Sequence, residues 1–295
     1  VMAAVASAQP AQGPKIEKAD FKDPGKLEYR FKKGETETYL TETKSDTKTE
    51  VKVMGMEMTI SAKGTMRQLL KLTVLDDAVP AKAEIITEHI QMKQSVDSAM
   101  SAMDITVDDR KIKATSGDQV LVDTEGKVDN PMVEQFTQGI EHLGKKAVVL
   151  LGTDGRFGEK IEGDPAAVRF IRQLPDQSVF PIVFQPLEGL KVGHTWEVET
   201  ETSSVQQIAL TKPLKTKTVN KVVGGAAVDG VHCTEIEFTW VLKASNVEGT
   251  TKQAGQDMPM NISAMAVTMS GKAYYDPARN RPIYATTKGV VEIEA

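Results

Sequence analysis

LEGLKVGHTWEVET, residues 187–200, is the stretch around which the rest of the chain is organised. Gly189 and Gly193 indicate a tight turn, and an alternating segment follows them. From Trp196 to Thr202, every second residue is apolar or threonine, and glutamates occupy the positions between. This period of two predicts a strand with one buried and one solvated face. Strands and the helix signals precede this stretch, and a second run of strands follows it.

The composition predicts a core built on aliphatic side chains. The chain has 295 residues, of which 40% are hydrophobic but only 5% aromatic, so the core must rest on Val, Ile, Leu and Met. A chain of this length forms one large or two smaller domains with a sizeable core. The net charge is −5 with interspersed signs, which excludes the basic footprint of a nucleic-acid-binding protein. Cys233 is the only cysteine, so an intramolecular disulfide is excluded.

The first residues resemble the end of a secretory signal peptide. Residues 1–8 form a small apolar run that ends in Ala6-Ser7-Ala8, which predicts cleavage after Ala8. The alternative is an alanine-rich terminus. Residues 9–26 are predicted to be a flexible leader. No later apolar run reaches the ~20 residues that a membrane-spanning helix needs. We therefore expect an exported protein, periplasmic or extracellular, that is soluble or peripherally attached.

Helix signals appear only in the middle of the chain. Asn130-Pro131 provides an N-cap and a first-turn proline, and Gly144 marks a helix end. Residues 164–175 predict a second helix that starts at an Asp-Pro pair and stops at a proline. Residues 179–184 predict an apolar linker or a third short helix. The first of these helices has an apolar stripe of Met132, Val133, Phe136, Ile140 and Leu143.

Alternating residues predict two runs of strands. An Asp-Gly turn at 154–155 predicts a hairpin between the runs, from 147–151 to 156–161, and residues 246–257 predict a loop or a weak strand end. The strands of the first run are expected at 27–31, 36–53, 56–74, 83–92, 106–115 and 119–123. Those of the second run are expected at 194–208, 214–223, 231–242, 259–275 and 281–294.

A short internal match predicts a duplication. MEMTISA at 56–62 and MPMNISA at 258–264 agree at five of seven positions. We interpret residues 27–128 and 187–295 as two β-meander repeats, with 129–186 as a helical and hairpin segment between them. The alternative is a chance likeness of two Thr- and Val-rich meanders. The predicted fold is mainly β: a curved antiparallel sheet or half-open barrel from two meander repeats, with two or three short helices in the middle.

Several short motifs carry a family resemblance. They are Gly-His-Thr-Trp at 193–196, the hydrophobic and proline-containing segment before it, Asp-Gly-Arg at 154–156, and the Gly-x-x-Tyr-Tyr-Asp ending at 271–276. With these motifs the chain resembles an uncharacterised family of exported bacterial β-sheet proteins over most of its length. The pattern of strands around a central helical segment is also similar to the half-open barrels of bacterial lipoprotein carriers. Neither resemblance implies catalytic residues.

No catalytic motif is recognisable. The chain lacks Gly-x-Ser-x-Gly, His-Glu-x-x-His, Cys-x-x-Cys and P-loop patterns. Its four histidines are scattered without ligand spacing, so we predict no catalytic residue, no cofactor and no metal site. The histidines are His89, His142, His194 and His232.

Methionine and tryptophan supply the candidate ligand-binding residues. Met54, Met56 and Met58 share one face of a strand, at intervals of about 7 Å. An apolar ligand could contact such adaptable side chains, whereas the alternatives are core packing and soft binding of copper. A helix over the concave face would either cap a pocket or fill it. Trp196 is expected to be buried against the 179–184 segment or the helix before it. The candidate ligand-binding residues are Trp196, Trp240, Met56, Met58, Met258 and Met260.

These observations favour a non-catalytic exported binding or envelope-associated protein. The expected partner is an apolar small molecule, a lipid or another envelope protein, and nucleic acid is not expected. A structural or assembly component of the cell envelope, an enzyme with an unrecognised site, and a copper protein are the alternatives.

Overall fold

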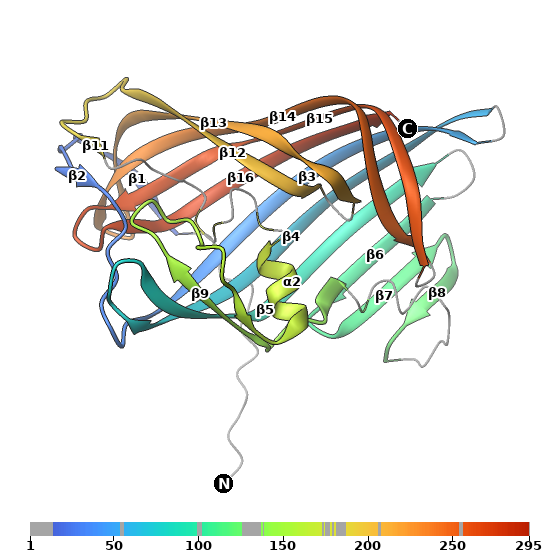
Figure 1. Cartoon of the computed structure of the whole chain (residues 1–295), viewed down its shortest axis with the longest axis horizontal. Helices are drawn as coiled ribbons and strands as arrows, with labels where there is room; N and C mark the ends of the chain where they lie inside the picture. Colours follow the sequence, from blue (N-terminus) through green and yellow to red (C-terminus); the bar gives the residue numbers. More distant parts are fainter. Residues whose placement is uncertain are drawn as a thin grey trace, which may run out of the picture.

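One large curved sheet forms almost the whole molecule (Figure 1). The described residues form a sheet of 14 strands, and a separate two-stranded sheet lies at one of its ends. The computed structural model describes residues 14–53, 56–98, 102–125, 137, 139–172, 174, 178, 180, 187–205, 208–253 and 256–294.

The strands of the first half begin near the N-terminus and include three long ones. They are β1 (Ile16–Ala19), β2 (Lys26–Leu27), β3 (Thr36–Val53), β4 (Met56–Asp76), β5 (Ala81–Ser98), β6 (Ala102–Asp108), β7 (Lys111–Ser116) and β8 (Gln119–Asp123). The middle and second half contribute β9 (Lys146–Leu151), β10 (Glu162–Gly163), α2 (Pro165–Arg172), β11 (Leu187–Glu188), β12 (Thr195–Val205), β13 (Ile208–Val228), β14 (Val231–Gln253), β15 (Gln256–Asp276) and β16 (Arg281–Glu294).

The sheet joins the two halves of the chain along one parallel pair. Its order is β13-β14-β15-β16-β3-β4-β5-β6-β7-β8, and β1 and β12 pair with successive parts of β13. All the other strand pairs are antiparallel, but β16 runs parallel to β3. The sheet is therefore mixed, not antiparallel as the sequence predicted. A hairpin turn fixes antiparallel neighbours, whereas β16 and β3 meet from opposite ends of the chain, so no turn sets their direction.

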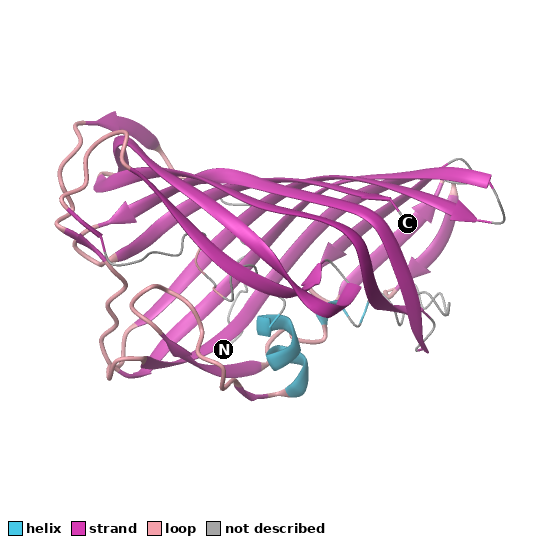
Figure 2. Ribbon diagram, turned by 45° about the horizontal axis from the view of Figure 1, so that its top comes forward, coloured by secondary structure: helices cyan, strands magenta, loops and turns pink. Residues whose placement is uncertain are grey.

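The sheet is strongly curved and is not closed into a barrel. In Figure 2 the long strands form one arched layer, with α2 on its hollow side. We call the hollow side the inner face. Burial alternates along the strands that build it, so that Ile236, Phe238 and Leu242 of β14 are buried and Glu237 and Lys243 are exposed.

Buried side chains of the inner face form three clusters. We call the end of the sheet that holds the turns before β5 and β16 its base, and the opposite end, where β3 and β14 finish, its tip. The base core includes Leu72, Tyr29, Ile171 of α2 and Trp196. The tip core lies on β12–β16 and includes Trp240. The edge core lies on β6–β8. The remaining members of the tip core are Val205, Ile208, Leu242, Val247, Ile262, Met265, Val267, Val291 and Ile293, and the edge core comprises Ile105, Val107, Ile112, Ala114 and Val122.

Alternation located the long strands but predicted β5, β13 and β14 too short, and it missed several local features. β3 has the predicted bounds, whereas the strand expected at 27–31 is reduced to β2, which pairs with β11. Part of the predicted leader, residues 16–19, forms β1 and adds to β13. Residues 246–257, predicted as a loop or a weak strand end, belong to β14 and β15, apart from residues 254 and 255, which lie outside the described part.

The middle segment also differs from the prediction. Asp154-Gly155 does make a turn, but the expected return strand is only a bridge between Leu151 and Phe157. The strand expected at 106–115 is split by a turn at Asp109, whose φ is 54°. The second predicted helix is confirmed as α2. Asp164 Oδ1 caps its first turn by accepting a hydrogen bond from the Ala166 amide at 2.9 Å. Most of the first predicted helix lies outside the described residues.

The two halves have matching strand registers. β4 begins at Met56 and β15 at Gln256, and each strand ends 20 residues later at an aspartate. Val53 pairs with Met56 in the first hairpin, and Gln253 pairs with Gln256 in the second. The sequence match aligns Met56 with Met258, which lies two residues further along its strand. Two residues are one strand period, so both alignments keep the same face. Duplication itself stays a prediction.

Candidate functional site

Two adjacent rows of side chains cross the inner face through the middle of the sheet. Each row follows the cross-strand partners from β12 to β5. The first row is Trp196, Asn220, Phe238, Gly271, Thr287, Thr43, Met66 and Met92. The second row is Val198, Thr218, Trp240, Met269, Gly289, Ser45, Gly64 and Gln94.

The structure places the two predicted tryptophans in neighbouring rows. Trp196 is 8% exposed in the base core, and Trp240 is 7% exposed in the tip core. The burial predicted for Trp196 is confirmed, and Trp196 shares its cluster with Phe180 of the predicted 179–184 segment. The tryptophans therefore mark the place where the two cores meet.

The predicted methionines do not converge. Met56 and Met58 belong to β4, and Met258 and Met260 belong to β15, with β16 and β3 between these strands. Strands three positions apart are separated by about 14 Å, which is too far for the methionines of β4 and those of β15 to contact one small ligand. Met260 is half-buried against the tip core, whereas the side chains of the other three lie outside the described residues. Within the described residues, no group of three or more His, Cys, Asp or Glu could hold a metal ion.

Asn220 is a buried amide that sequence reasoning missed. It is 0% exposed, and neither its Oδ1 nor its Nδ2 has a hydrogen-bond partner among the residues that the structure describes. Its cross-strand neighbours are Trp196 on one side and Phe238 on the other. Asparagine is disfavoured in strands, and an unpaired buried amide is costly. An asparagine at an inward position of the 214–223 segment was the signal that could have revealed it.

One section of the inner face is only half-buried. This section lies on the tip halves of β3, β4 and β5. The side chains there combine a row of hydroxyls on β3 with small or apolar groups on β4 and β5. The half-buried residues are Thr43, Ser45, Thr47 and Thr49 of β3, Ile60, Ala62, Gly64 and Met66 of β4, and Met92, Gln94, Val96 and Ser98 of β5.

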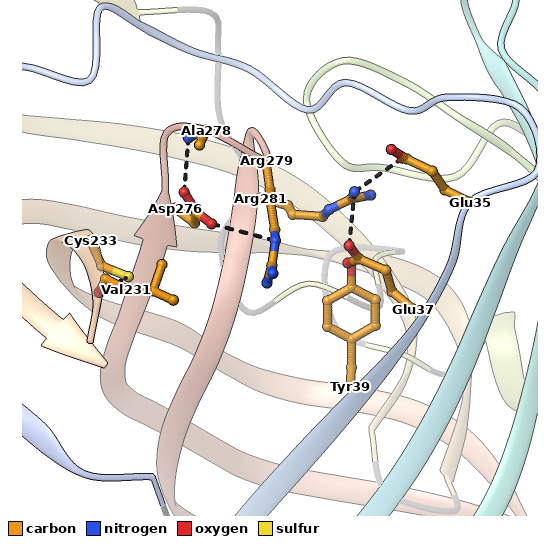
Figure 3. A network of polar contacts seen from close by, with 9 residues as sticks. All are labelled: Glu35, Glu37, Tyr39, Val231, Cys233, Asp276, Ala278, Arg279 and Arg281. Atoms are coloured by element: carbon orange, nitrogen blue, oxygen red, sulfur yellow. Dashed lines mark hydrogen bonds and ion pairs between the residues drawn. The ribbon is translucent and has the colours of Figure 1, made fainter. Parts of the chain in front are cut away.

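A charged network lies where the parallel pair begins (Figure 3). Arg281 is the first residue of β16, and its side chain is 4% exposed. Its Nη2 lies 3.0 Å from a carboxylate oxygen of Glu35 and 2.8 Å from one of Glu37. The Tyr39 hydroxyl donates to the other oxygen of Glu37 at 2.7 Å. The network thus ties the start of β16 to the start of β3.

The network holds its groups in fixed charge states. Burial acts to raise the pKa of Glu35, but hydrogen bonding and the charge of Arg281 outweigh it and lower that pKa below its ordinary value of 4.5. Burial and the Glu37 carboxylate raise the pKa of Tyr39 far above its usual range. A general acid or base needs a pKa near the working pH. Neither Glu35 nor Tyr39 fits that role at neutral pH.

Two other buried groups keep one protonation state at neutral pH. Burial lowers the pKa of His142 to about 4, and its ring stacks on Phe170 at 3.8 Å. Burial raises the pKa of the Cys233 thiol to about 12. At neutral pH the His142 imidazole is therefore uncharged, and the Cys233 thiol stays protonated instead of forming the nucleophilic thiolate.

Comparison with protein families, curated proteins and solved structures finds no match to this chain.

The outer face carries two shallow grooves lined by charged side chains. The first, of about 490 Å³, lies over β3–β6 and is lined by Lys44, Lys63 and Lys93 among others. The second, of about 600 Å³, lies over β14, β15, β16 and β3. Lys63 pairs with Asp46 at 3.5 Å, and Ser95 donates to Asp104 at 2.5 Å in the first groove. Such exposed, mutually paired charges are typical of a solvated sheet face.

The helical part of the described chain is small. Helix α2 has eight residues, and it packs against β9 and β10. Within the described part of the chain, no helix has the length and apolar character that crossing a membrane requires.

Proposed function

We propose that this chain is a non-catalytic, exported binding protein that holds an apolar or amphipathic small molecule, such as a lipid, against the inner face of its sheet. The observation that carries the proposal is the half-buried section on the tip halves of β3, β4 and β5. There, apolar side chains such as Ile60, Met66 and Val96 keep part of their surface exposed on a face that is buried elsewhere.

The chemistry of this section suits an adaptable apolar ligand. Exposed apolar surface that is contiguous on one face commonly marks a binding site. Met66 and Met92 lie opposite each other there, and unbranched thioether side chains repack around ligands of different shape. The hydroxyls of Thr43, Ser45 and Thr47 lie beside them on β3 and offer hydrogen bonds to a polar end of the ligand.

The open sheet supports access to this section. Within the described residues, β8 at one edge and β12 at the other do not pair with each other. A closed barrel of this size would admit a ligand only at its mouths, whereas an open sheet admits one along its length. The Ala6-Ser7-Ala8 pattern, which resembles the end of a signal peptide, supports export, and export would place such a carrier or envelope-associated protein outside the cytoplasm.

Titration with the fluorescent apolar probe N-phenyl-1-naphthylamine tests the proposal. We expect saturable binding by the natural chain and loss of binding by Met66→Glu, which places a charge on the half-buried inner section. Thr65→Glu is the matched control, because Thr65 is the next residue of β4 and is exposed on the outer face. Absence of saturable binding by the natural chain, or equal binding by the two variants when both are folded, contradicts the proposal.

A further inference from the structure

We infer that the molecule held on the inner face is an uncharged lipid with hydroxyl or ester groups at its polar end, such as a monoacylglycerol, and that this end lies on β3. The inference rests on the proposed function and names its ligand class. It starts from two properties of the half-buried section on β3, β4 and β5. None of the half-buried residues that form the section carries a charge, and its β3 side presents only hydroxyls.

The hydroxyls on the β3 side of the section have no hydrogen-bond partner among the described residues. Their neighbours on β4 are apolar or glycine, and on β16 only Thr287 offers a hydroxyl. Where two inner-face hydroxyls lie opposite each other elsewhere, at Thr200 and Thr216, they hydrogen-bond at 2.6 Å. We call the β3 set the hydroxyl row, and it consists of Thr43, Ser45, Thr47 and Thr49.

The hydroxyl row suits a neutral polar group. A hydroxyl donates one hydrogen bond and accepts others, so it can pair with the alcohol and ester oxygens of an acylglycerol. Successive members of the row are about 7 Å apart along the strand, which lets a headgroup with several oxygens contact more than one of them. An alkane would leave all these hydroxyls unpaired.

The lack of charge in the section argues against an ionic headgroup. An ion that leaves water needs a partner of opposite charge, as Arg and Lys provide for carboxylates and phosphates. The lysines of these strands, Lys44, Lys63 and Lys93, alternate with the inner residues and are exposed on the outer face. Along the inward positions of β3 the nearest charged residue is Glu37, about 20 Å from the hydroxyl row and already paired with Arg281.

The apolar chain of the lipid has its own surface on the far side of the section. Met92 and Val96 of β5 pack against the edge core, which continues over β6 to β8. The strand order β3-β4-β5-β6 therefore runs from hydroxyls, through half-buried apolar side chains, to a buried apolar cluster. A lipid that lies across these strands has its polar end over β3 and its acyl chain over β4 and β5.

Competition between three lipids of equal chain length tests the inference. Monolauroylglycerol, laurate and dodecyltrimethylammonium, each below its micelle concentration, are used to displace N-phenyl-1-naphthylamine from the natural chain at neutral pH. We expect monolauroylglycerol to bind about tenfold more tightly than either ion. Equal or tighter binding of either ion overturns the inference and leaves the proposed function standing. If N-phenyl-1-naphthylamine and all three lipids fail to bind, the inference and the proposed function fall together.

Paired valine variants locate the polar end. Thr43→Val combined with Thr47→Val removes two hydroxyls of the row and keeps the size of both side chains. We expect about a tenfold loss of affinity for monolauroylglycerol and an unchanged affinity for N-phenyl-1-naphthylamine. Thr59→Val combined with Thr65→Val is the control, since both threonines belong to β4 and are exposed on the outer face. Equal affinity of the two folded double variants for monolauroylglycerol overturns the assignment of the polar end to β3.

A cation in the hydroxyl row should reverse the preference of the site. Thr47→Lys should bind laurate more tightly than monolauroylglycerol, because the ammonium supplies the missing counter-charge. Thr65→Lys adds the same charge to the outer face and should keep the preference of the natural chain. An unchanged preference in folded Thr47→Lys overturns the inference. Should this variant not fold, the competition on the natural chain decides, because it needs no substitution.

Discussion

At the scale of single residues, Arg281 is the side chain whose loss should matter most to stability. Its guanidinium is buried, and Arg281→Met would leave Glu35 and Glu37 close together without a counter-charge. Removing one partner of a buried ion pair is strongly destabilising, and we expect a loss of about 3 kcal/mol in the free energy of unfolding, because both glutamates keep some exposure. Urea denaturation measures this loss.

The control for Arg281 is an exposed ion pair. Lys217→Met removes a bridge to Glu197 at 2.8 Å in which both side chains are about half exposed. Such surface pairs contribute less than about 1 kcal/mol. If Lys217→Met and Arg281→Met have the same effect, the network at the parallel pair does not stabilise the fold.

The same network predicts a pH dependence. The pKa of Glu35 is lower in the folded chain than its ordinary value of 4.5. A carboxylate with a depressed folded-state pKa stabilises the fold above the unfolded value, and this contribution disappears as the pH falls through the folded value. We therefore expect the stability of the natural chain to decline below about pH 4.5 more steeply than that of Arg281→Met. Thermal unfolding between pH 3 and 6 tests this, and parallel curves would contradict it.

Trp196 is the second residue with a large expected effect. Trp196→Ala removes a side chain that is 8% exposed in the base core, and such truncations cost about 3–5 kcal/mol. Val192→Ala, in the turn before it, changes a side chain that is 55% exposed and should stay within about 0.5 kcal/mol. An unchanged melting temperature for Trp196→Ala, together with lost binding of the apolar probe, would assign the tryptophan to the ligand instead of the core.

At the scale of elements, β14 changes the face it buries part-way along its length. Leu242 is buried before Asn246 and Val247 after it, so the inward positions change from even to odd residues. Asn246 has a φ of 54°, in the left-handed region that asparagine and glycine tolerate. The partner strand β15 shows the same change between Ile262 and Met265. One left-handed residue thus lets both strands continue into the tip core.

The left-handed conformation of Asn246 predicts different effects for two substitutions. Asn246→Gly should change the free energy of unfolding little, because glycine adopts positive φ without a steric penalty. Asn246→Val should cost about 1–2 kcal/mol, because a branched side chain is strained in the left-handed region. Chemical denaturation of both variants makes the comparison. Equal stability would show that this residue relaxes to negative φ without cost.

At the scale of the whole molecule, the sheet has a well-packed base and a more open tip. The base core combines residues from the sheet and α2 with Tyr29 and Phe180, whereas the tip halves of β3–β5 have half-buried inner side chains. Regions with fewer buried contacts open more readily. We therefore expect faster amide hydrogen exchange at residues 45–49 and 60–64 than at 70–74 and 81–85. Equal protection along β4 and β5 would contradict this division.

The same difference should respond to the ligand. If the apolar probe lies on the inner face, amides at 60–64 should gain protection from exchange when N-phenyl-1-naphthylamine is bound. Binding to the folded strands stabilises them against the local opening that exchange requires. Residues 70–74, which already lie under the base core, should change less. Protection gained only on strands other than β3, β4 and β5 would place the probe elsewhere.

The sequence by itself determined the local elements. Alternation of apolar and polar residues depends only on neighbours along the chain, so it predicted β3 with its bounds, the inward side of β12 and the turn before β16 at residues 276–280. The scarcity of aromatic residues also singled out Trp196 and Trp240. The predictions of β3, β12 and the turn succeeded because a strand period of two is visible within a few residues.

Only the tertiary structure decided which strands became neighbours. The parallel pairing of β16 with β3, the addition of β1 to β13 and the row that places Asn220 between Trp196 and Phe238 join residues distant in sequence. Alternation did not single out Asn220, which is buried in this row. Pairing of distant strands is selected by burial over the whole curved sheet, a quantity that no local window of sequence contains.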